Sequence, residues 1–225
     1  MSSGLPSKQK SNAGTAATGR EVWKKAGLLW LTLTYYAGSY FIAQRISLAL
    51  PQHTLTSYLD AALPFIPPFI YLYLQVYLIA LLPLVIVDSY QALRRDCLAY
   101  VTNLTGTFVV FMIYPTTIIR PVPVVTGFNE FAVALLYRAD LPVCCFPSLH
   151  VSMAVLASLI VTREHRRLGL ACHIATIAVA LSTLFLKQHY VADVLGGYAM
   201  ALVAYGLVNY RSVLTPAWLR IGRTA

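Results

Sequence analysis

Residues 147–210 read PSLHVSMAVLASLIVTREHRRLGLACHIATIAVALSTLFLKQHYVADVLGGYAMALVAYGLVNY. This stretch holds three apolar runs, at about 147–163, 168–186 and 190–210, and the basic turn REHRR separates the first two. Each run is close to the roughly 20 residues that a helix needs to cross the hydrocarbon core of a bilayer, and the first is the shortest. We therefore predict three consecutive membrane-spanning helices here.

Three more apolar runs precede this stretch, at about 26–46, 67–87 and 97–116. The chain has 225 residues, of which 58% are hydrophobic and 11% are charged, and its mean hydropathy is +0.67. This composition is far more apolar than that of a soluble globular domain. The sequence thus predicts an all-α fold, a bundle of six transmembrane helices. Residues 128–137 are amphipathic and are expected to lie along the membrane surface.

The basic residues indicate how the bundle is oriented in the membrane. With six spans, thirteen of them fall on the side of the two termini: Lys8, Lys10, Arg20, Lys24, Lys25, Arg94, Arg95, Arg163, Arg166, Arg167, Arg211, Arg220 and Arg223. The other four fall on the opposite side: Arg45, Arg120, Arg138 and Lys187. Because cytoplasmic loops are rich in lysine and arginine, both termini are predicted to be cytoplasmic. The net charge of +9 is then a topology signal that requires no nucleic-acid partner.

The chain is predicted to form a single membrane domain with a short segment at each end. Residues 1–21, rich in Ser, Gly, Ala and Thr, are expected to be a disordered cytoplasmic N-terminus. Residues 22–212 would form the six-helix domain, and residues 213–225 a cytoplasmic tail. The first apolar run begins too late for a cleaved signal peptide. The spacing of the cysteines indicates neither a disulfide framework nor a metal site.

Two polar clusters interrupt this apolar background, FPSLH at 146–150 and HYVAD at 189–193. His189 and Asp193 are four residues apart and would share one face of a helix, where the carboxylate can orient the imidazole and raise its basicity. His150 follows a Pro-Ser pair that can start a helix, and the N–H groups of a helix N-terminus attract anions. The predicted topology puts both clusters and Arg120 at the outer face. Two histidines there can act on one phosphate, one attacking and the other protonating the leaving oxygen.

These clusters resemble the motifs of the type 2 phosphatidic acid phosphatase superfamily. Arg120-Pro121 resembles the end of the first motif, residues 147–150 the second and residues 189–193 the third. The forms FPSLH and HYxxDVLxG look most like the inositol phosphorylceramide synthase branch of that superfamily. The resemblance covers roughly residues 114–197.

The resemblance implies a six-helix core and a reaction that uses no metal ion or other cofactor. It implies that His189 attacks phosphorus, that Asp193 orients His189, and that His150 protonates the leaving group. Arg120 and the region of Ser148 would bind phosphate oxygens. The phosphoryl group would then pass to water or to an alcohol.

Two basic residues of the superfamily's motifs are absent from this chain. Ile113 stands where a lysine usually precedes the arginine of the first motif, and Thr183 stands where the third motif usually has an arginine. A phosphate group normally binds several charged donors. We predict that Lys187, two residues before His189, supplies one of them, and Arg138 is the other available cation.

The sequence therefore predicts an integral membrane lipid phosphatase or phosphotransferase, with transfer of an inositol-phosphate or sphingolipid headgroup as its more specific form. Its partners would be a lipid phosphate substrate and the bilayer. The alternative is a noncatalytic membrane protein, a transporter or a scaffold, that keeps the fold. The two missing basic residues are the main support for this alternative. The short chain and loops favour a bacterial inner membrane, with the site facing the periplasm or exterior.

Overall fold

The computed structural model describes the backbone of residues 8–214 and the side chains of residues 19–210. Its elements are α1 (Lys8–Leu48), α2 (Tyr58–Ala62), the 3₁₀ helix η1 (Pro67–Phe69), α3 (Ile70–Tyr73), α4 (Gln75–Ile86), α5 (Tyr90–Ile113), α6 (Phe128–Ala139), α7 (Leu149–Glu164), α8 (Arg166–Phe185) and α9 (Val191–Leu214). No strand occurs in this part of the chain, where two isolated β-bridges join loop segments. The predicted all-α fold is confirmed.

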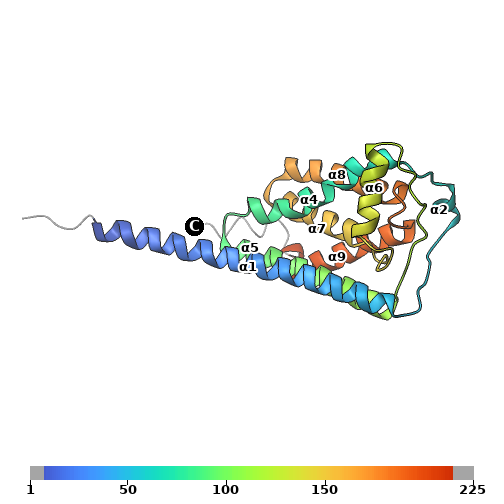
Figure 1. Cartoon of the computed structure of the whole chain (residues 1–225). Coiled ribbons are helices and arrows are strands. Elements are labelled where there is room, and N and C mark those ends of the chain that lie inside the picture. Colours follow the sequence, from blue (N-terminus) through green and yellow to red (C-terminus); the bar gives the residue numbers. More distant parts are fainter. Residues whose placement is uncertain (1–7, 215–225) are drawn as a thin grey trace, which may run out of the picture.

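Helix α7 forms the centre of the bundle, because it contacts α4, α5, α8 and α9 (Figure 1). Its core side chains are fully or almost fully buried, and several are small, such as Ala154 and Ala157. Small side chains let neighbouring helices approach closely, which favours packing in a bilayer. The hydroxyl groups of Ser158 and Thr176 are 2.9 Å apart and tie α7 to α8. The shortest predicted span is therefore the most enclosed one.

Four helices in the described part of the chain are long and apolar enough to cross a membrane: Pro67–Ile86, Tyr90–Ile113, Arg166–Phe185 and Val191–Tyr210. They correspond to the second, third, fifth and sixth predicted spans. The first predicted span lies inside α1, and the fourth is α7, which has 16 residues. The four apolar helices indicate a membrane protein, while six crossings and the orientation of the termini stay predictions.

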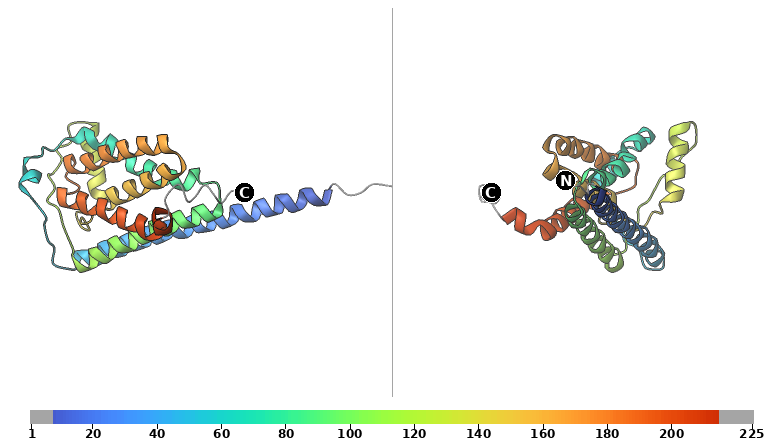
Figure 2. Two further views of the ribbon diagram at one scale, coloured as in Figure 1. Left: turned by 180° about the vertical axis from the view of Figure 1, so that it is seen from behind. Right: turned by 90° about the vertical axis from the view of Figure 1, so that its left-hand side faces the viewer.

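Helix α1 differs from the prediction at its beginning. Disorder is expected for residues 1–21, whereas the chain is helical from Lys8 onward. Alanine, glutamine and lysine residues in this stretch have high helix propensities, so the apolar helix can extend back through it. α1 and α5 lie side by side, and the first turns of α1 project past the bundle (Figures 1 and 2). Residues 1–7 and 215–225, the latter most of the predicted tail, lie outside the described residues.

Helix α6 lies at one end of the bundle and runs across the direction of the long helices (Figure 1). Its bounds agree with the amphipathic segment predicted at 128–137. One face packs against η1 and α3 through the buried Val133. On its other side, Phe128, Phe131 and Leu135 are each more than half exposed. Such a helix is suited to the boundary between lipid and water.

Two glycines in the first turns of α9 bring this helix against the loop before α7. A Cβ atom on Gly196 would lie 2.5 Å from the ring of Phe146, and one on Gly197 would overlap the backbone carbonyl oxygen of Ser148. Only a residue without a side chain allows this approach. The contact brings the two polar clusters of the sequence next to each other.

Replacement of Gly197 by alanine is expected to lower the free energy of unfolding by about 1–3 kcal/mol, because the Ser148 carbonyl belongs to the backbone and cannot rotate away. Gly206→Ala is the matched control, since Gly206 also lies in α9 and nothing is within 4 Å of its added Cβ. Thermal unfolding in detergent should show a lower midpoint for Gly197→Ala than for Gly206→Ala. Equal midpoints would contradict the packing argument.

Candidate active site

His189 lies in the short connection between α8 and α9, and Asp193 lies in the first turn of α9. Nδ1 of His189 is 3.4 Å from Oδ2 of Asp193, an ion-pair distance without the alignment of a hydrogen bond. Asp193 is fully buried, and its Oδ2 also accepts the N–H of Tyr190 at 2.8 Å, as in helix capping. The predicted pair is therefore present. It is built by a helix cap and not by one helical face, because α9 begins only at Val191.

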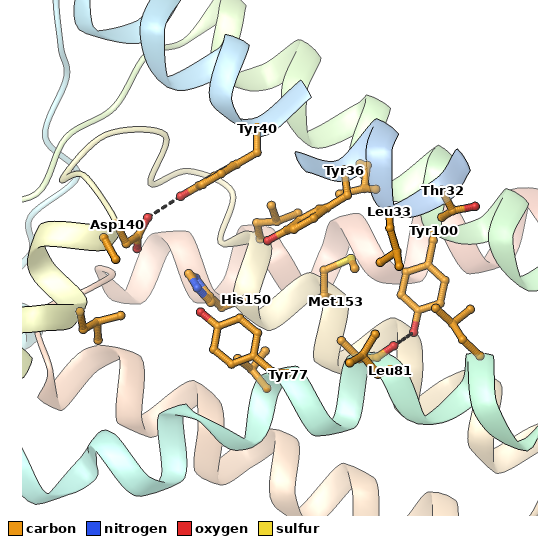
Figure 3. A pocket seen from close by; sticks show the side chains of 17 residues that line it. Thr32, Leu33, Tyr36, Tyr40, Tyr77, Leu81, Tyr100, Asp140, His150 and Met153 are labelled. Atoms are coloured by element: carbon orange, nitrogen blue, oxygen red, sulfur yellow. Dashed lines mark hydrogen bonds between the residues drawn. The ribbon is translucent and has the colours of Figure 1, made fainter. Parts of the chain in front are cut away.

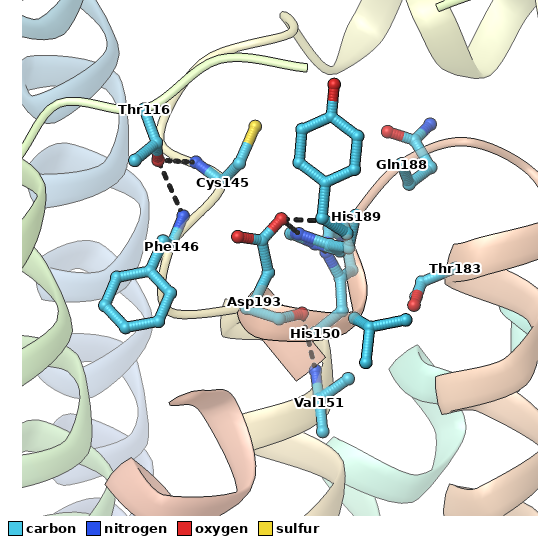
Figure 4. A network of polar contacts seen from close by, with 12 residues as sticks. Thr116, Cys145, Phe146, His150, Val151, Thr183, Gln188, His189 and Asp193 are labelled. Carbon is cyan, nitrogen blue, oxygen red and sulfur yellow. Dashed lines mark hydrogen bonds and ion pairs between the residues drawn. The ribbon is translucent and has the colours of Figure 1, made fainter. Parts of the chain in front are cut away.

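His150 is the second residue of α7, and Ser148 is the N-cap of that helix. Oγ of Ser148 accepts the N–H of Val151 at 3.3 Å (Figure 4). The Ser148 N–H donates to the carbonyl oxygen of Asp193 at 2.9 Å. The predicted helix start is confirmed. Ser148 is fully buried and does not line the cavity at the histidines. The structure thus gives Ser148 a capping contact, and its contact with phosphate stays a prediction.

The two histidines contact each other (Figure 4). Nδ1 of His150 is 3.2 Å from Nε2 of His189, and Nε2 of His150 is 2.6 Å from the hydroxyl of Tyr73. When this hydroxyl donates to Nε2, the His150 proton resides on Nδ1 and faces His189. Tyr73 comes from α3 and is fully buried. Sequence analysis missed it, because nothing in the local sequence separates it from the other fourteen of the 15 tyrosines.

Arg120 lies in the extended segment before α6, and its side chain is 8% exposed. Nη1 donates to the backbone carbonyl of Asp140 at 2.5 Å, and Nη2 donates to Oε1 of Gln188. Nη2 is also 3.7 Å from Oδ2 of Asp140. The guanidinium carbon is 4.8 Å from the centre of the Tyr137 ring. Nε is buried without a hydrogen-bond partner. Arg120 therefore has one free N–H group that could donate a hydrogen bond to an oxyanion.

The end of α6 contributes two residues to this site. Burial raises the pKa of Tyr137 to about 12, although the neighbouring Arg120 lowers it. The phenol therefore stays protonated, and it donates to the carbonyl oxygen of Leu186 at 2.6 Å, which ties α6 to α8. Asp140, the residue that directly follows α6, pairs with Arg120.

The structure does not bring Lys187 to the phosphate-binding side chains. Its Nζ donates to the carbonyl oxygens of Asp60 and Leu63 at 2.9 and 2.7 Å, in the loop around α2. Oδ1 of Asp60 in turn accepts the N–H of Val191 at 2.8 Å, so this loop holds the beginning of α9. Arg138 is exposed and does not line the cavity at the histidines. Neither cation therefore lines the cavity at the histidines, and phosphate binding by Lys187 stays a prediction.

A small cavity lies at these side chains. Its lining consists of Tyr40, Arg120, Asp140, Val143, Cys144, Cys145, Leu149, His150, Gln188 and His189. A second cavity, of about 330 Å³, continues from it between α1, α4, α5, α6 and α7 (Figure 3). The residues that line both are Tyr40, Asp140, Leu149 and His150. Most of the second cavity is apolar or aromatic, so a polar end at His150 leads into an apolar space.

The loop before α7 is fixed by Thr116, whose Oγ1 accepts the N–H groups of Cys145 and Phe146 at 3.1 and 2.8 Å (Figure 4). Burial raises the pKa of the Cys144 thiol to about 11 and that of Cys145 well above its usual range. Both cysteines are therefore protonated thiols at neutral pH and poor nucleophiles. Among the side chains of residues 19–210, no group that could hold a metal ion comes together.

The fold and the site together define a class of protein: a helical membrane protein with two histidines, a buried carboxylate and an arginine gathered at one end of its bundle. Residues 51–207 match the PAP2 superfamily, and the chain belongs to that superfamily. Membership supports phosphatase-type action on a lipid. No curated protein and no solved structure matches the chain. The predicted superfamily is thus confirmed, and the synthase-like branch stays a prediction.

Proposed function

We propose that the protein is an integral membrane lipid phosphatase or phosphotransferase that works through a phosphohistidine on His189. The observation that carries the proposal is the 3.2 Å contact between Nδ1 of His150 and Nε2 of His189, with Asp193 against the other nitrogen of His189. Two imidazole nitrogens at one small cavity can reach the same phosphorus atom. The superfamily match supports the same chemistry.

In the first half of the reaction, the lone pair on Nε2 of His189 attacks phosphorus and forms a P–N bond. The bond between phosphorus and the leaving oxygen breaks, and this oxygen takes a proton from Nδ1 of His150. Asp193 stabilises the positive charge that develops on the His189 ring. Arg120 donates to the phosphate oxygens, which carry more charge in the transition state.

In the second half, water or an alcohol gives its proton to Nδ1 of His150, and its oxygen attacks phosphorus. The P–N bond breaks, and His189 regains its lone pair. Water as acceptor releases free phosphate from a monoester, which is the phosphatase reaction. An alcohol as acceptor gives a new phosphate ester, which is the transferase reaction, and an inositol-phosphate or sphingolipid headgroup would follow this route.

The second cavity supports a lipid as the substrate. It begins at His150, where the leaving oxygen receives its proton, and it continues through a mainly apolar lining. Leu33, Tyr77 and Leu81 of this lining are each about half exposed on α1 and α4. A hydrocarbon chain can therefore pass between these two helices while its phosphate reaches the histidines.

The proposal includes six spans with both termini in the cytoplasm and the site at the outer face. The distribution of lysine and arginine supports this orientation. The position of α6 across one end of the bundle, next to Arg120 and the histidines, also supports it (Figure 1). A bacterial inner membrane, with the site toward the periplasm or exterior, remains the location that we propose.

The proposal is tested with purified protein in detergent and a panel of lipid phosphates: phosphatidic acid, phosphatidylinositol, a polyprenyl phosphate and a sphingolipid phosphate. Free phosphate and headgroup exchange are measured with and without an added alcohol acceptor. We expect turnover that vanadate inhibits, because vanadate adopts the five-coordinate geometry of the transferring phosphoryl group. Release of free phosphate from a monoester, or of a phosphorylated headgroup from a diester, would assign hydrolysis, and exchange without either product would assign the transferase reaction.

The alternative function, a noncatalytic membrane protein that keeps the fold, is favoured by one observation. Neither Lys187 nor Arg138 reaches the cavity, so Arg120 is the lone lysine or arginine that lines it in the described part of the chain. The same assay decides between the two. Absence of turnover and of a phosphoenzyme with every lipid of the panel would favour the noncatalytic protein.

A further inference from the structure

The charge around the phosphate site is unusual for a protein that binds phosphate. With neutral histidines, the site carries one positive charge, on Arg120, and two negative charges, on Asp140 and Asp193. Asp193 lies against His189, so its charge offsets the imidazolium that forms during attack. Asp140 forms no ion pair with either histidine, and its partners are Arg120 and Tyr40. Its carboxylate therefore acts on whatever anion enters the cavity.

The position of Asp140 is fixed on several sides. It directly follows α6, and its side chain is 17% exposed. Oδ1 accepts the hydroxyl of Tyr40 from α1, and Oδ2 is 3.7 Å from Nη2 of Arg120. Asp140 lines both the small cavity and the apolar cavity, at the place where they join (Figure 3). The headgroup of a bound lipid thus has to pass this carboxylate.

Phosphate esters differ in charge at neutral pH. A phosphomonoester has a second pKa of about 6 and carries about −1.5 to −2 charges at pH 7. A phosphodiester carries one negative charge, because its second ionisable oxygen is esterified. A carboxylate a few ångströms away repels the second charge of the monoester, and this repulsion is strong where the effective dielectric constant is well below that of water. Arg120 alone cannot offset two charges on the ligand and one on Asp140.

We infer that Asp140 selects phosphate groups with a single negative charge, so that the substrates of this site are phosphodiester lipids in preference to phosphomonoesters. The inference rests on the proposed function and names its substrate class. It also accounts for the absence of two basic residues of the superfamily's motifs. A site that lacks two cations of the superfamily's motifs and has the Asp140 carboxylate in its lining binds a monoanion better than a dianion.

The test compares two lipids that give the same product, diacylglycerol: dioleoyl phosphatidic acid, a monoester, and dioleoyl phosphatidylinositol or phosphatidylglycerol, which are diesters. The quantity measured is the ratio of kcat/KM for the monoester to that for the better diester. The wild type should prefer the diester. Asp140→Asn, which keeps the shape of the side chain and can still accept from Tyr40, should raise the ratio by about tenfold or more.

Glu130→Gln is the matched control for this variant. Glu130 lies in the first turn of the same helix and does not line either cavity, so the change removes one negative charge from α6 without altering the site. Its ratio should equal that of the wild type. An equal rise in both variants would mean that the net charge of α6, and not the carboxylate of Asp140, sets the preference, and the inference would be wrong.

A second measurement needs no variant. In the wild type, the same ratio should fall as pH rises from 5 to 8, because the monoester loses its second proton near pH 6 and the dianion is rejected. The titratable and charged groups around Asp140 are Tyr36, Tyr40, Tyr73, Tyr77, Arg120, Tyr137, Cys144, Cys145, His150 and His189. Because they are the same in the wild type and in Asp140→Asn, the difference between the two pH profiles reports the contribution of Asp140. Asp140→Asn should make the decline shallower.

The experiments distinguish failure of the inference from failure of the proposed function. If the wild type turns over the monoester and no diester, or if the ratio is the same in the wild type and in Asp140→Asn, the inference is overturned while the proposed function stands. If neither lipid gives diacylglycerol in a manner that depends on His189, the proposed function fails and the inference fails with it.

Discussion

Replacement of His189 by alanine will lower the rate of diacylglycerol release from the better lipid substrate by about 10⁴-fold or more, because it removes the atom that bonds to phosphorus. Nε2 is the nitrogen in question, since Nδ1 lies against Asp193. The wild type, quenched during turnover with radiolabelled substrate, should carry a phosphate that is labile in acid and stable in base, as a P–N bond is. The variant should carry none.

His173→Ala provides the control for this experiment. His173 lies within α8 and lines neither cavity, so its loss should leave the rate within about twofold of the wild type. Both variants are compared by thermal unfolding in detergent, which separates a chemical effect from a folding defect. A His189→Ala protein that folds and retains more than about a hundredth of the wild-type rate would exclude His189 as the nucleophile.

Replacement of His150 by alanine is the second large expected effect, and its size should depend on the leaving group. With a lipid alcohol as the leaving group, kcat should fall by about 10²–10⁴-fold, because an alkoxide leaves poorly without a proton. With an analogue whose leaving group is 4-nitrophenol, the loss should be much smaller, because that phenolate needs no proton. Release of diacylglycerol and of nitrophenol are the two measurements.

His150→Gln keeps a polar side chain that can still bond to the hydroxyl of Tyr73, so it controls for the loss of that contact. A glutamine cannot act as the acid, and the same dependence on the leaving group is expected. An equal loss with both leaving groups, in both variants, would assign His150 to the positioning of phosphate or of His189 and would remove its role as the acid.

Much of this fold could be predicted because it depends on patterns that are local in the sequence. An apolar run of about 20 residues must satisfy its backbone hydrogen bonds internally in a bilayer, so it predicts a helix from composition alone. The start of α7 could also be predicted from neighbouring residues, because Ser148 caps the helix that places His150. The pair His189 and Asp193 was predicted correctly, but from a helical face that the structure replaces with a cap.

Other parts of the site could not be predicted, because they depend on contacts between distant segments. Tyr73 reaches His150 from a helix 77 positions away in the sequence, and Asp140 reaches Arg120 from the end of the interfacial helix. Lys187 shows the opposite case. It is close to His189 along the chain, yet its ammonium group is held by the carbonyl groups of the loop around α2. Proximity in sequence at a turn says little about where a long side chain ends.

The hydrogen bond from the N–H of Ser148 to the carbonyl oxygen of Asp193 joins the beginnings of α7 and α9 through backbone atoms alone. This bond links the two segments that carry the histidines. We therefore expect the two rings to move together, with their spacing preserved, when the bundle flexes or when thickness fluctuations of the bilayer tilt α9. The two histidines would then keep the spacing that the proposed reaction needs while the helices around the apolar cavity separate to admit or release a lipid chain.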